Sequence, residues 1–312
     1  MKAGFVVILG RSNVGKSTLL NALAGAKIAA VADKPQTTRE AIQGVVTRPE
    51  GQIVFVDCPG VHDPAMELGR HMMREVRRAT AGCHLALLVV DSTARLHKHD
   101  EAAIEIVRGL RLPALACLNK IDALKAKHAL LPAIDRLREM QDFAEYVPLS
   151  ARTGENVDLL LNLIFERLPE APPYYPEDFI TDQPERFLAA ELIRERVIEN
   201  TEREVPHSIA VLIEKWEATP RLLRIAAVIY VERDGQKKIT IGAGGQKIKQ
   251  IGTEAREQIE SFFGSKVFLE LFVKVRPGWR DNPSFVRSLD FRQLVGQEDT
   301  AEYETPETIP GA

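Results

Sequence analysis

Residues 10–17 read Gly10-Arg11-Ser12-Asn13-Val14-Gly15-Lys16-Ser17 and match the pattern G-x-x-x-x-G-K-[ST] of a phosphate-binding loop. The apolar run VVIL precedes this stretch and STLLNALAG follows it, so the match lies where a strand leads into a helix. Glycines let backbone N–H groups turn toward phosphates, and the first turn of a helix adds a favourable dipole. We expect Lys16 to reach the β- and γ-phosphates, the Ser17 hydroxyl to bind Mg²⁺, and Thr18 to line the same site. The alternative, a glycine-rich turn that binds nothing, is disfavoured because lysine and serine stand in register.

Apolar runs of strand length continue along the first half of the chain and alternate with helical patterns. They occupy residues 5–9, 42–47, 53–57, 85–91, 114–119 and 146–150. Such alternation is typical of βαβ units, and LALLVV is apolar enough for a strand buried on both faces. The sequence therefore predicts an α/β nucleotide-binding domain over residues 1–169, with a mostly parallel sheet and helices on both faces.

Two further segments place magnesium ligands near the phosphates. Asp57-Cys58-Pro59-Gly60-Val61 begins at the end of a predicted strand, where the Asp57 carboxylate can hold Mg²⁺ through water. Thr37-Thr38-Arg39 lies in a polar segment, and a hydroxyl there, assigned to Thr38, can complete the Mg²⁺ shell only while the γ-phosphate is present. A plain Pro-Gly turn and a solvated loop are the respective alternatives. The expected catalytic residues are Lys16, Thr38, Asp57 and Gly60.

A third pair of segments indicates which base is bound. Asn119-Lys120-Ile121-Asp122 ends the predicted strand ALACLN, and the Asp122 carboxylate can accept two hydrogen bonds from the N1–H and N2–H₂ groups of guanine. Adenine lacks this pair of donors and would leave the carboxylate unpaired, so discrimination should be large. Ser150-Ala151-Arg152 ends the last predicted strand of this domain and is expected to offer backbone N–H groups to the guanine O6. The expected substrate and product are therefore GTP and GDP.

The organisation changes in the second half of the chain. Three prolines within residues 172–176 block both a helix and a central strand, so we interpret residues 170–184 as a linker. A helix over 185–203, strands at 208–216 and 223–231, a helix at 247–262 and a strand at 266–275 follow. These patterns predict a separate α+β domain over residues 185–296. The polar residues 297–312 are expected to form a disordered tail.

The second domain carries a G-x-x-G stretch, Gly242-Ala243-Gly244-Gly245, which we expect between a strand and a helix. A loop this small lets a nucleic-acid backbone approach closely, and KH domains clamp about four nucleotides of single-stranded nucleic acid in this way. Basic residues surround it: Lys237, Lys238, Lys247, Lys249 and Arg256. The expected RNA contacts are the four loop residues with Lys238, Lys247 and Lys249; the alternative is a structural turn. Trp279 either stacks on a base or closes the core.

Bulk properties agree with a globular protein of two domains. The chain has 312 residues, 45% of them hydrophobic, and a formal net charge of -3, which argues against a protein that coats nucleic acid along its whole length. Cys58, Cys83 and Cys117 form no CxxC pair and are expected to be reduced core residues. No apolar run approaches the roughly 18 residues of a membrane span. We expect a cytoplasmic protein, with peripheral contact at the cytoplasmic face of the membrane left open.

The set GRSNVGKS, TTR, DCPG, NKID and SAR resembles the translation-factor-related GTPases of bacteria. The segments YYPEDFITDQPERFLAAELIRE, IGAGGQKIKQIG and LELFVKVRPGWR make the chain similar to the Era family, from about Gly4 to Val295. The resemblance implies a GTPase domain joined to a type II KH domain. It also implies binding of the 3′ end of 16S rRNA and a role in 30S subunit assembly, with GTP opening the RNA site. We expect a monomer.

The resemblance also bears on hydrolysis. Many GTPases place a water-orienting Gln after the DxxG glycine, whereas Era-like proteins share the apolar residue seen here at Val61. Slow turnover is expected, and Asn13 matches an asparagine that holds K⁺ in potassium-dependent relatives. The alternative for Asn13 is a loop residue whose side chain bonds its own backbone. A general-base role for His62 is disfavoured, because a histidine in a loop is more often solvated. Two other functions are weighed: an RNA chaperone in which turnover is not essential, and a membrane-associated regulatory GTPase.

Overall fold

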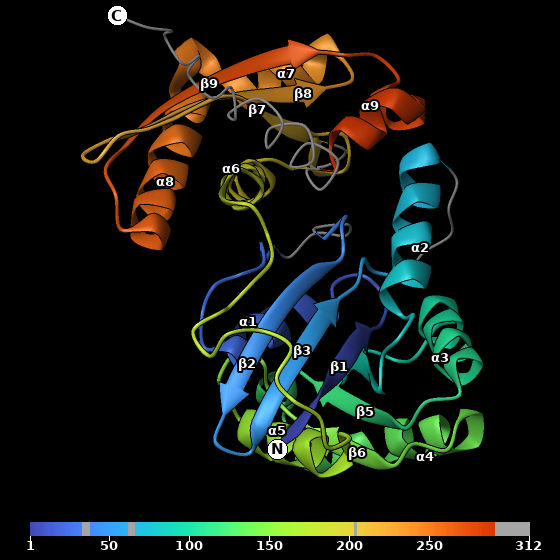
Figure 1. Cartoon of the computed structure of the whole chain (residues 1–312). Helices are drawn as coiled ribbons and strands as arrows, with labels where there is room; N and C mark the ends of the chain where they lie inside the picture. The colour runs from blue at the N-terminus through green and yellow to red at the C-terminus, as the bar shows by residue number, and fades with distance from the viewer. Residues whose placement is uncertain (33–37, 62–65, 203–204, 291–312) are drawn as a thin grey trace, which may run out of the picture.

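The computed structural model describes residues 1–32, 38–61, 66–202 and 205–290, and these residues form two parts (Figure 1). The first part is built on a six-stranded sheet of order β2-β3-β1-β4-β5-β6, in which β2 alone is antiparallel to its neighbour. Its strands are β1 (Lys2–Leu9), β2 (Ile42–Arg48), β3 (Gly51–Asp57), β4 (Leu85–Asp91), β5 (Ala114–Asn119) and β6 (Glu145–Pro148). The expected mostly parallel sheet is confirmed.

Helices cover both faces of this sheet because successive strand residues point to opposite sides. Val6 and Ile8 of β1 pack in one apolar cluster with α1 and α5, whereas Val7 and Leu9 pack in another with α2, α3 and α4. The helices are α1 (Lys16–Ala24), α2 (Glu67–Ala79), α3 (Lys98–Leu110), α4 (Leu131–Met140) and α5 (Val157–Arg167), with 3₁₀ turns η1 (Ile121–Ala123) and η2 (Lys127–Leu130). All three cysteines are buried and free, as expected.

Residues 171–184 contain no helix or strand, yet they are packed against the first part. The backbone N–H of Val45 donates to the carbonyl of Ile180 at 2.8 Å, and the Thr181 hydroxyl donates to the Gln43 carbonyl at 2.7 Å. The predicted linker thus covers the outer edge of β2, which would otherwise present unpaired backbone groups.

The second part is a three-stranded sheet of order β7-β8-β9, antiparallel between β7 and β8 and parallel between β8 and β9. Its elements are α6 (Glu185–Glu199), η3 (Val205–His207), β7 (Ala210–Ala218), β8 (Leu223–Val231), α7 (Asp234–Ile241), η4 (Ala243–Gly245), α8 (Gln246–Phe263), β9 (Val267–Val275), η5 (Trp279–Asp281) and α9 (Pro283–Ser288). Among the described helices, none is long and apolar enough to cross a membrane.

Helix α7 corrects one expectation, since it was predicted neither as a helix nor as the element before the G-x-x-G loop. That loop lies between two helices, α7 and α8, rather than between a strand and a helix. The reason is composition: α7 reads DGQKKITI, and only Gln236 and Thr240 of it are buried. A helix this short with a polar buried side has no apolar repeat to detect.

The two parts share buried surface. Leu20 and Ile28 of the first part belong to the same apolar cluster as Leu188 and Leu192 of α6. Figure 1 shows α6 between the two sheets, and α2 rising from the first part toward α9 of the second. The helices α2 and α9 contact each other, so the segment that follows the Asp57 strand reaches the second part directly.

Candidate functional site

The predicted phosphate-binding loop joins β1 to α1. Lys16 is the first residue of α1, and its Nζ donates to the Arg11 carbonyl at 3.0 Å, across the loop. Burial lowers the pKa of Lys16, although the nearby Asp57 opposes this effect. Gly15 has φ 95° and lies so close to Asn119 that a Cβ would be 2.3 Å from the Asn119 amide nitrogen. The loop therefore requires glycine at this position.

The loop encloses a pocket together with a segment that the sequence did not indicate. The pocket is lined by Ser12, Asn13, Gly15, Lys16, Ser17, Thr18, Ala30, Val31, Ala32, Thr38 and Gly60. Asn13 has φ 64°, a left-handed conformation that asparagine tolerates better than most residues. Asn13 is one of the residues that line the pocket, which is where a cation held by Asn13 would be.

The three predicted magnesium ligands converge beside this pocket. The Ser17 hydroxyl donates to Asp57 Oδ2 at 2.6 Å and lies 2.6 Å from the Thr38 hydroxyl. Asp57 is fully buried, and burial raises its pKa to about 6. Its Oδ1 atom has no hydrogen-bond partner among the described residues. An oxygen-rich group with an unsatisfied buried carboxylate oxygen fits Mg²⁺, which takes hard oxygen ligands. Thr37 lies outside the described residues.

The segment after Asp57 closes the pocket from the other side. A Cβ on Gly60 would lie 2.4 Å from the Ser12 hydroxyl, so only glycine fits there. The N–H of Val61 donates to the Gly10 carbonyl at 3.1 Å, and the Val61 side chain is buried. Cys58 and Pro59 are buried as well, and burial raises the pKa of the Cys58 thiol. His62, weighed as a general base, lies outside the described residues.

The predicted base-binding residues lie at the carboxyl end of β5. Asn119 Nδ2 donates to the Val14 carbonyl at 2.8 Å and ties this motif to the phosphate-binding loop. Lys120 Nζ donates to the Asn13 carbonyl and to Asp91, both at 2.7 Å. Asp91 was missed by the sequence reasoning, although its place at the end of β4 was a usable signal.

Asp122 is held as a carboxylate acceptor. Ser150 Oγ donates to its Oδ1 at 2.6 Å and lowers its pKa, and Arg152 pairs with its Oδ2. Two of the N–H groups expected to serve guanine O6 are engaged within the chain. The Ala151 N–H donates to Asn119 Oδ1 at 2.9 Å, and the Ser150 N–H donates to the Glu155 carbonyl at 3.0 Å. These hydrogen bonds shape the loop, and the role of this segment toward guanine O6 stays a prediction.

Arg11 contributes its backbone rather than its side chain. Its Nε donates to Asp100 of α3 at 3.1 Å, and its guanidinium lies 3.9 Å from Asp91. These ion pairs direct the side chain toward α3. The Arg11 side chain therefore stabilises the loop, and Lys16 is the residue that can bind the phosphates.

In the second part, the G-x-x-G loop is at the surface. Gly242 has φ 75°, and a Cβ on it would lie 2.6 Å from the Lys247 Cβ, so the turn into α8 requires glycine. Ala243 and Gly244 are exposed and Gly245 is half-buried. A groove next to this loop is lined by Ile248, Lys249, Gly252, Thr253, Arg256, Leu269 and Leu271. Among the described residues, Lys238, Lys247 and Lys249 have no carboxylate partner, so their charges are available to a phosphate backbone.

Trp279 belongs to the core, and base stacking is excluded for it. Its side chain is fully buried, its Nε1 donates to the Ser208 carbonyl at 2.9 Å, and it packs with Phe285 and Val286. The sequence alone left both roles open because an exposed and a buried tryptophan look alike in a turn.

Comparison with known proteins matches both parts. A family model described as "50S ribosome-binding GTPase" matches residues 5–120, and a KH domain model matches residues 204–280. GTPase Era of Staphylococcus haemolyticus is 44% identical over 291 residues, which are 93% of this chain and 97% of that protein.

Two solved structures resemble the whole chain. One is Era in complex with MgGDPNP and nucleotides 1506–1542 of 16S ribosomal RNA, with a TM-score of 0.90 and 40% identity over 93% of this chain and 99% of that one. The other is a variant of Aquifex aeolicus Era bound to GDP and AlF4⁻, with a TM-score of 0.89 and the same identity and coverage.

Proposed function

The chain belongs to the Era family of GTPases, and we propose that its GTP cycle controls binding of its KH domain to the 3′ end of 16S rRNA during 30S assembly. The observation that carries this proposal is the continuity between the two parts. A nucleotide site and an exposed G-x-x-G loop lie in one chain, and one buried apolar cluster spans both domains. A relative of 40% identity was solved with 16S rRNA nucleotides, which supports the choice of RNA.

Ser17 would hold Mg²⁺ directly and Asp57 through water with either nucleotide, and Thr38 would join them only with GTP. Mg²⁺, when bound, neutralises charge on the β- and γ-phosphate oxygens. The hydrogen bond to the Arg11 carbonyl positions Lys16 to bind the same oxygens. The hydrogen bond from Ser150 positions Asp122 to select guanine. A GTPase needs little more, because phosphoryl transfer depends mainly on positioning and electrostatic stabilisation.

Turnover in this site is proposed to be slow and to be stimulated by K⁺. The Val61 side chain is apolar and buried, so it cannot orient a water molecule as glutamine does in other GTPases. A monovalent cation beside the phosphates would supply positive charge that the side chains lack. Asn13 supports this role because it is one of the residues that line the phosphate pocket.

RNA binding is tested with a labelled oligonucleotide of the 16S 3′-end sequence, by fluorescence anisotropy with a non-hydrolysable GTP analogue or with GDP. Tighter binding with the analogue supports the proposal, and equal binding in the two states contradicts the control by GTP. Ala243→Asp places a carboxylate on the exposed loop and should weaken binding about tenfold, which corresponds to about 1.4 kcal/mol. Ala243→Asn is the matched neutral control and should bind within about twofold of the parent.

The buried Val61 also favours a second candidate function, an RNA chaperone in which nucleotide binding matters and turnover does not. Rescue of 30S assembly by a variant that binds GTP without hydrolysing it would select this function. We propose that the protein acts as a monomer in the cytoplasm, where its ribosomal partner is. Light scattering tests the monomer, and co-sedimentation with anionic vesicles tests peripheral membrane contact.

A further inference from the structure

Three consecutive residues, Thr38, Arg39 and Glu40, each reach a different part of the molecule. The Thr38 hydroxyl lies 2.6 Å from that of Ser17 in the nucleotide site. The next residue, Arg39, donates from Nη1 to the carbonyl of Ile209 in the KH domain at 2.7 Å. All three side chains are buried, with exposed fractions of 7%, 7% and 6%. A shift of the backbone at Thr38 therefore cannot leave the other two contacts unchanged.

On the KH side, Arg39 faces an aromatic ring and lies within electrostatic reach of Arg194, Arg280 and Glu191. Its guanidinium carbon lies 5.5 Å from the ring centroid of the fully buried Trp279. Its Nε and Nη2 atoms are buried without a hydrogen-bond partner among the described residues. A buried guanidinium with one hydrogen bond and one cation–π contact is held at an energetic cost. A modest change at the nucleotide site can therefore break the contacts of Arg39 with the KH domain.

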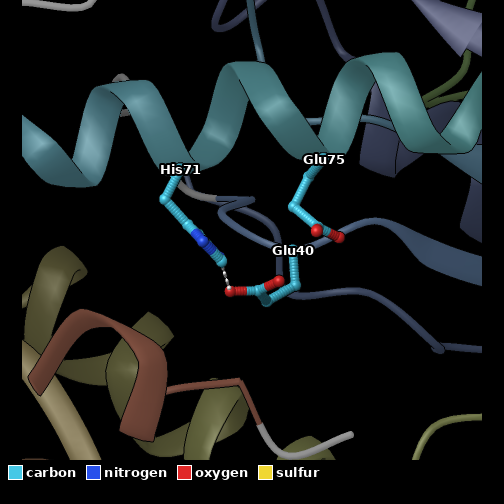
Figure 2. A group of neighbouring side chains, drawn as sticks. All are labelled: Glu40, His71 and Glu75. Carbon is cyan, nitrogen blue, oxygen red and sulfur yellow. Dashed lines mark hydrogen bonds and ion pairs between the residues drawn. The ribbon is translucent and has the colours of Figure 1, made fainter. Parts of the chain in front are cut away.

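Glu40 extends the same junction to helix α2. Its Oε1 atom lies 2.7 Å from Nε2 of His71, and Figure 2 shows His71 and Glu75 on one helix with Glu40 facing them from a neighbouring segment. Donor atoms of these three side chains lie within 4.8 Å of one another, a spacing that suits a metal ion. The contact that joins Glu40 to helix α2 is the hydrogen bond with His71.

Helix α2 itself packs on the residue that Arg39 contacts. Leu68 and Met72 belong to one apolar cluster with Trp279, Phe285 and Val286. The N–H of Glu67 also donates to Asp281 at 3.3 Å, just after Trp279. The two segments that flank the nucleotide site, 38–40 and α2, thus meet the KH domain around a single tryptophan.

We propose that Arg39 is the positioning residue that couples the nucleotide site to the KH domain: when Thr38 is held at the nucleotide site, Arg39 is fixed against Ile209 and Trp279. Release of Thr38 loosens this contact and frees the KH domain from the arrangement seen here. This inference rests on the proposed function and identifies the residue through which the nucleotide site affects the KH domain. Coupling between two sites in one protein is typically about 5- to 150-fold in affinity.

The measurement is the ratio of RNA affinities with a non-hydrolysable GTP analogue and with GDP, on the full chain. Arg39→Met removes the charge and the cation–π contact at similar length and should reduce this ratio to near one. Arg39→Lys keeps the charge without the planar donor group and should restore part of the affinity ratio. Nucleotide affinity, measured separately, should stay within about twofold in both variants.

The KH side offers an independent variant and the nucleotide domain a matched control. Trp279→Phe removes the indole that Arg39 faces and should lower the ratio even if Arg39→Met does not fold. Lys27→Met breaks a different interdomain ion pair, 2.6 Å from Glu195, and should leave the ratio unchanged. An equal loss in Lys27→Met would mean general loosening of the interface and would overturn the assignment of Arg39.

The two proposals fail in different ways. A wild-type ratio of one means that GTP does not control RNA binding, and the proposed function fails. A wild-type ratio well above one that persists in both Arg39→Met and Trp279→Phe overturns the Arg39 route alone. Linkage supplies a cross-check, because RNA must change nucleotide affinity by the same factor that nucleotide changes RNA affinity.

Discussion

The Ser17 hydroxyl donates a 2.6 Å hydrogen bond to the Asp57 carboxylate, across 40 positions of the chain. This contact joins the first turn of α1 to the last residue of β3, and both lie at the carboxyl ends of the parallel strands. Asp57 is fully buried there. A buried carboxylate of this kind is costly until a cation compensates it. The stability of the site and its ability to bind metal are therefore opposed.

Asp57→Asn should make the metal-free protein more stable and abolish its response to Mg²⁺. A rise in the pKa of Asp57 from 3.8 to about 6 corresponds to about 3 kcal/mol, which the neutral amide relieves at pH 7.5. Chemical denaturation with and without Mg²⁺ and GDP measures both effects. The idea fails if the variant is less stable than the parent without metal.

Asp122→Asn should lower GTP affinity by at least about 100-fold, because an amide presents a donor where guanine also presents donors. The same change should favour xanthosine triphosphate, whose base carries an acceptor in place of the 2-amino group. Competition binding with the two nucleotides gives the preference. Arg152→Met is the control: it removes the partner of Asp122 without removing the acceptor, and should keep most GTP affinity.

Replacing Na⁺ by K⁺ should raise GTP hydrolysis about tenfold or more in the parent protein, since a cation at Asn13 would add one favourable charge interaction in the transition state. Asn13→Ala should hydrolyse GTP at the same rate in both salts. Single-turnover rates at equal ionic strength test this. Equal parental rates in K⁺ and Na⁺ would remove Asn13 from the mechanism.

His71→Gln should destabilise the protein by about 2 kcal/mol at pH 6, because the charged pair with Glu40 is lost while a donor is kept. The hydrogen bond to Glu40 raises the pKa of His71 above its usual 6.5, with Glu75 and Asp290 acting in the same direction. While Glu40 is ionised, this stabilisation is present below pH 6.5 and is lost as the pH rises through the folded-state pKa of His71. Burial raises the pKa of Glu40, so the charged pair is also lost at lower pH, where Glu40 takes up a proton.

Unfolding free energies of the parent and of His71→Gln between pH 5.5 and pH 9 check this sign. The difference between the two proteins should shrink as the pH rises. A difference that is constant or grows with pH would show that His71 is neutral in the folded protein and that the pair with Glu40 is a simple hydrogen bond.

Much of the candidate site could be predicted because its motifs are contiguous. The loop over residues 10–17 places its own backbone N–H groups, so its residue types already specify its chemistry. Helix α7 could not be predicted, because its buried side is polar and gives no apolar repeat. The hydrogen bonds from the Ser150 and Ala151 N–H groups to Glu155 and Asn119 could not be predicted, because these partners are set by how the loop closes.

A guanine-nucleotide site followed by a G-x-x-G domain can be predicted from the residues alone, since each motif is local and its order along the chain is visible. The roles of Arg39 and Trp279 became clear from the folded chain. Arg39 is the last residue of the Thr37-Thr38-Arg39 motif, and Trp279 lies 240 residues further on in a turn. Burial and a 5.5 Å approach between them depend on how two domains pack, and packing between distant segments leaves no pattern in either segment alone.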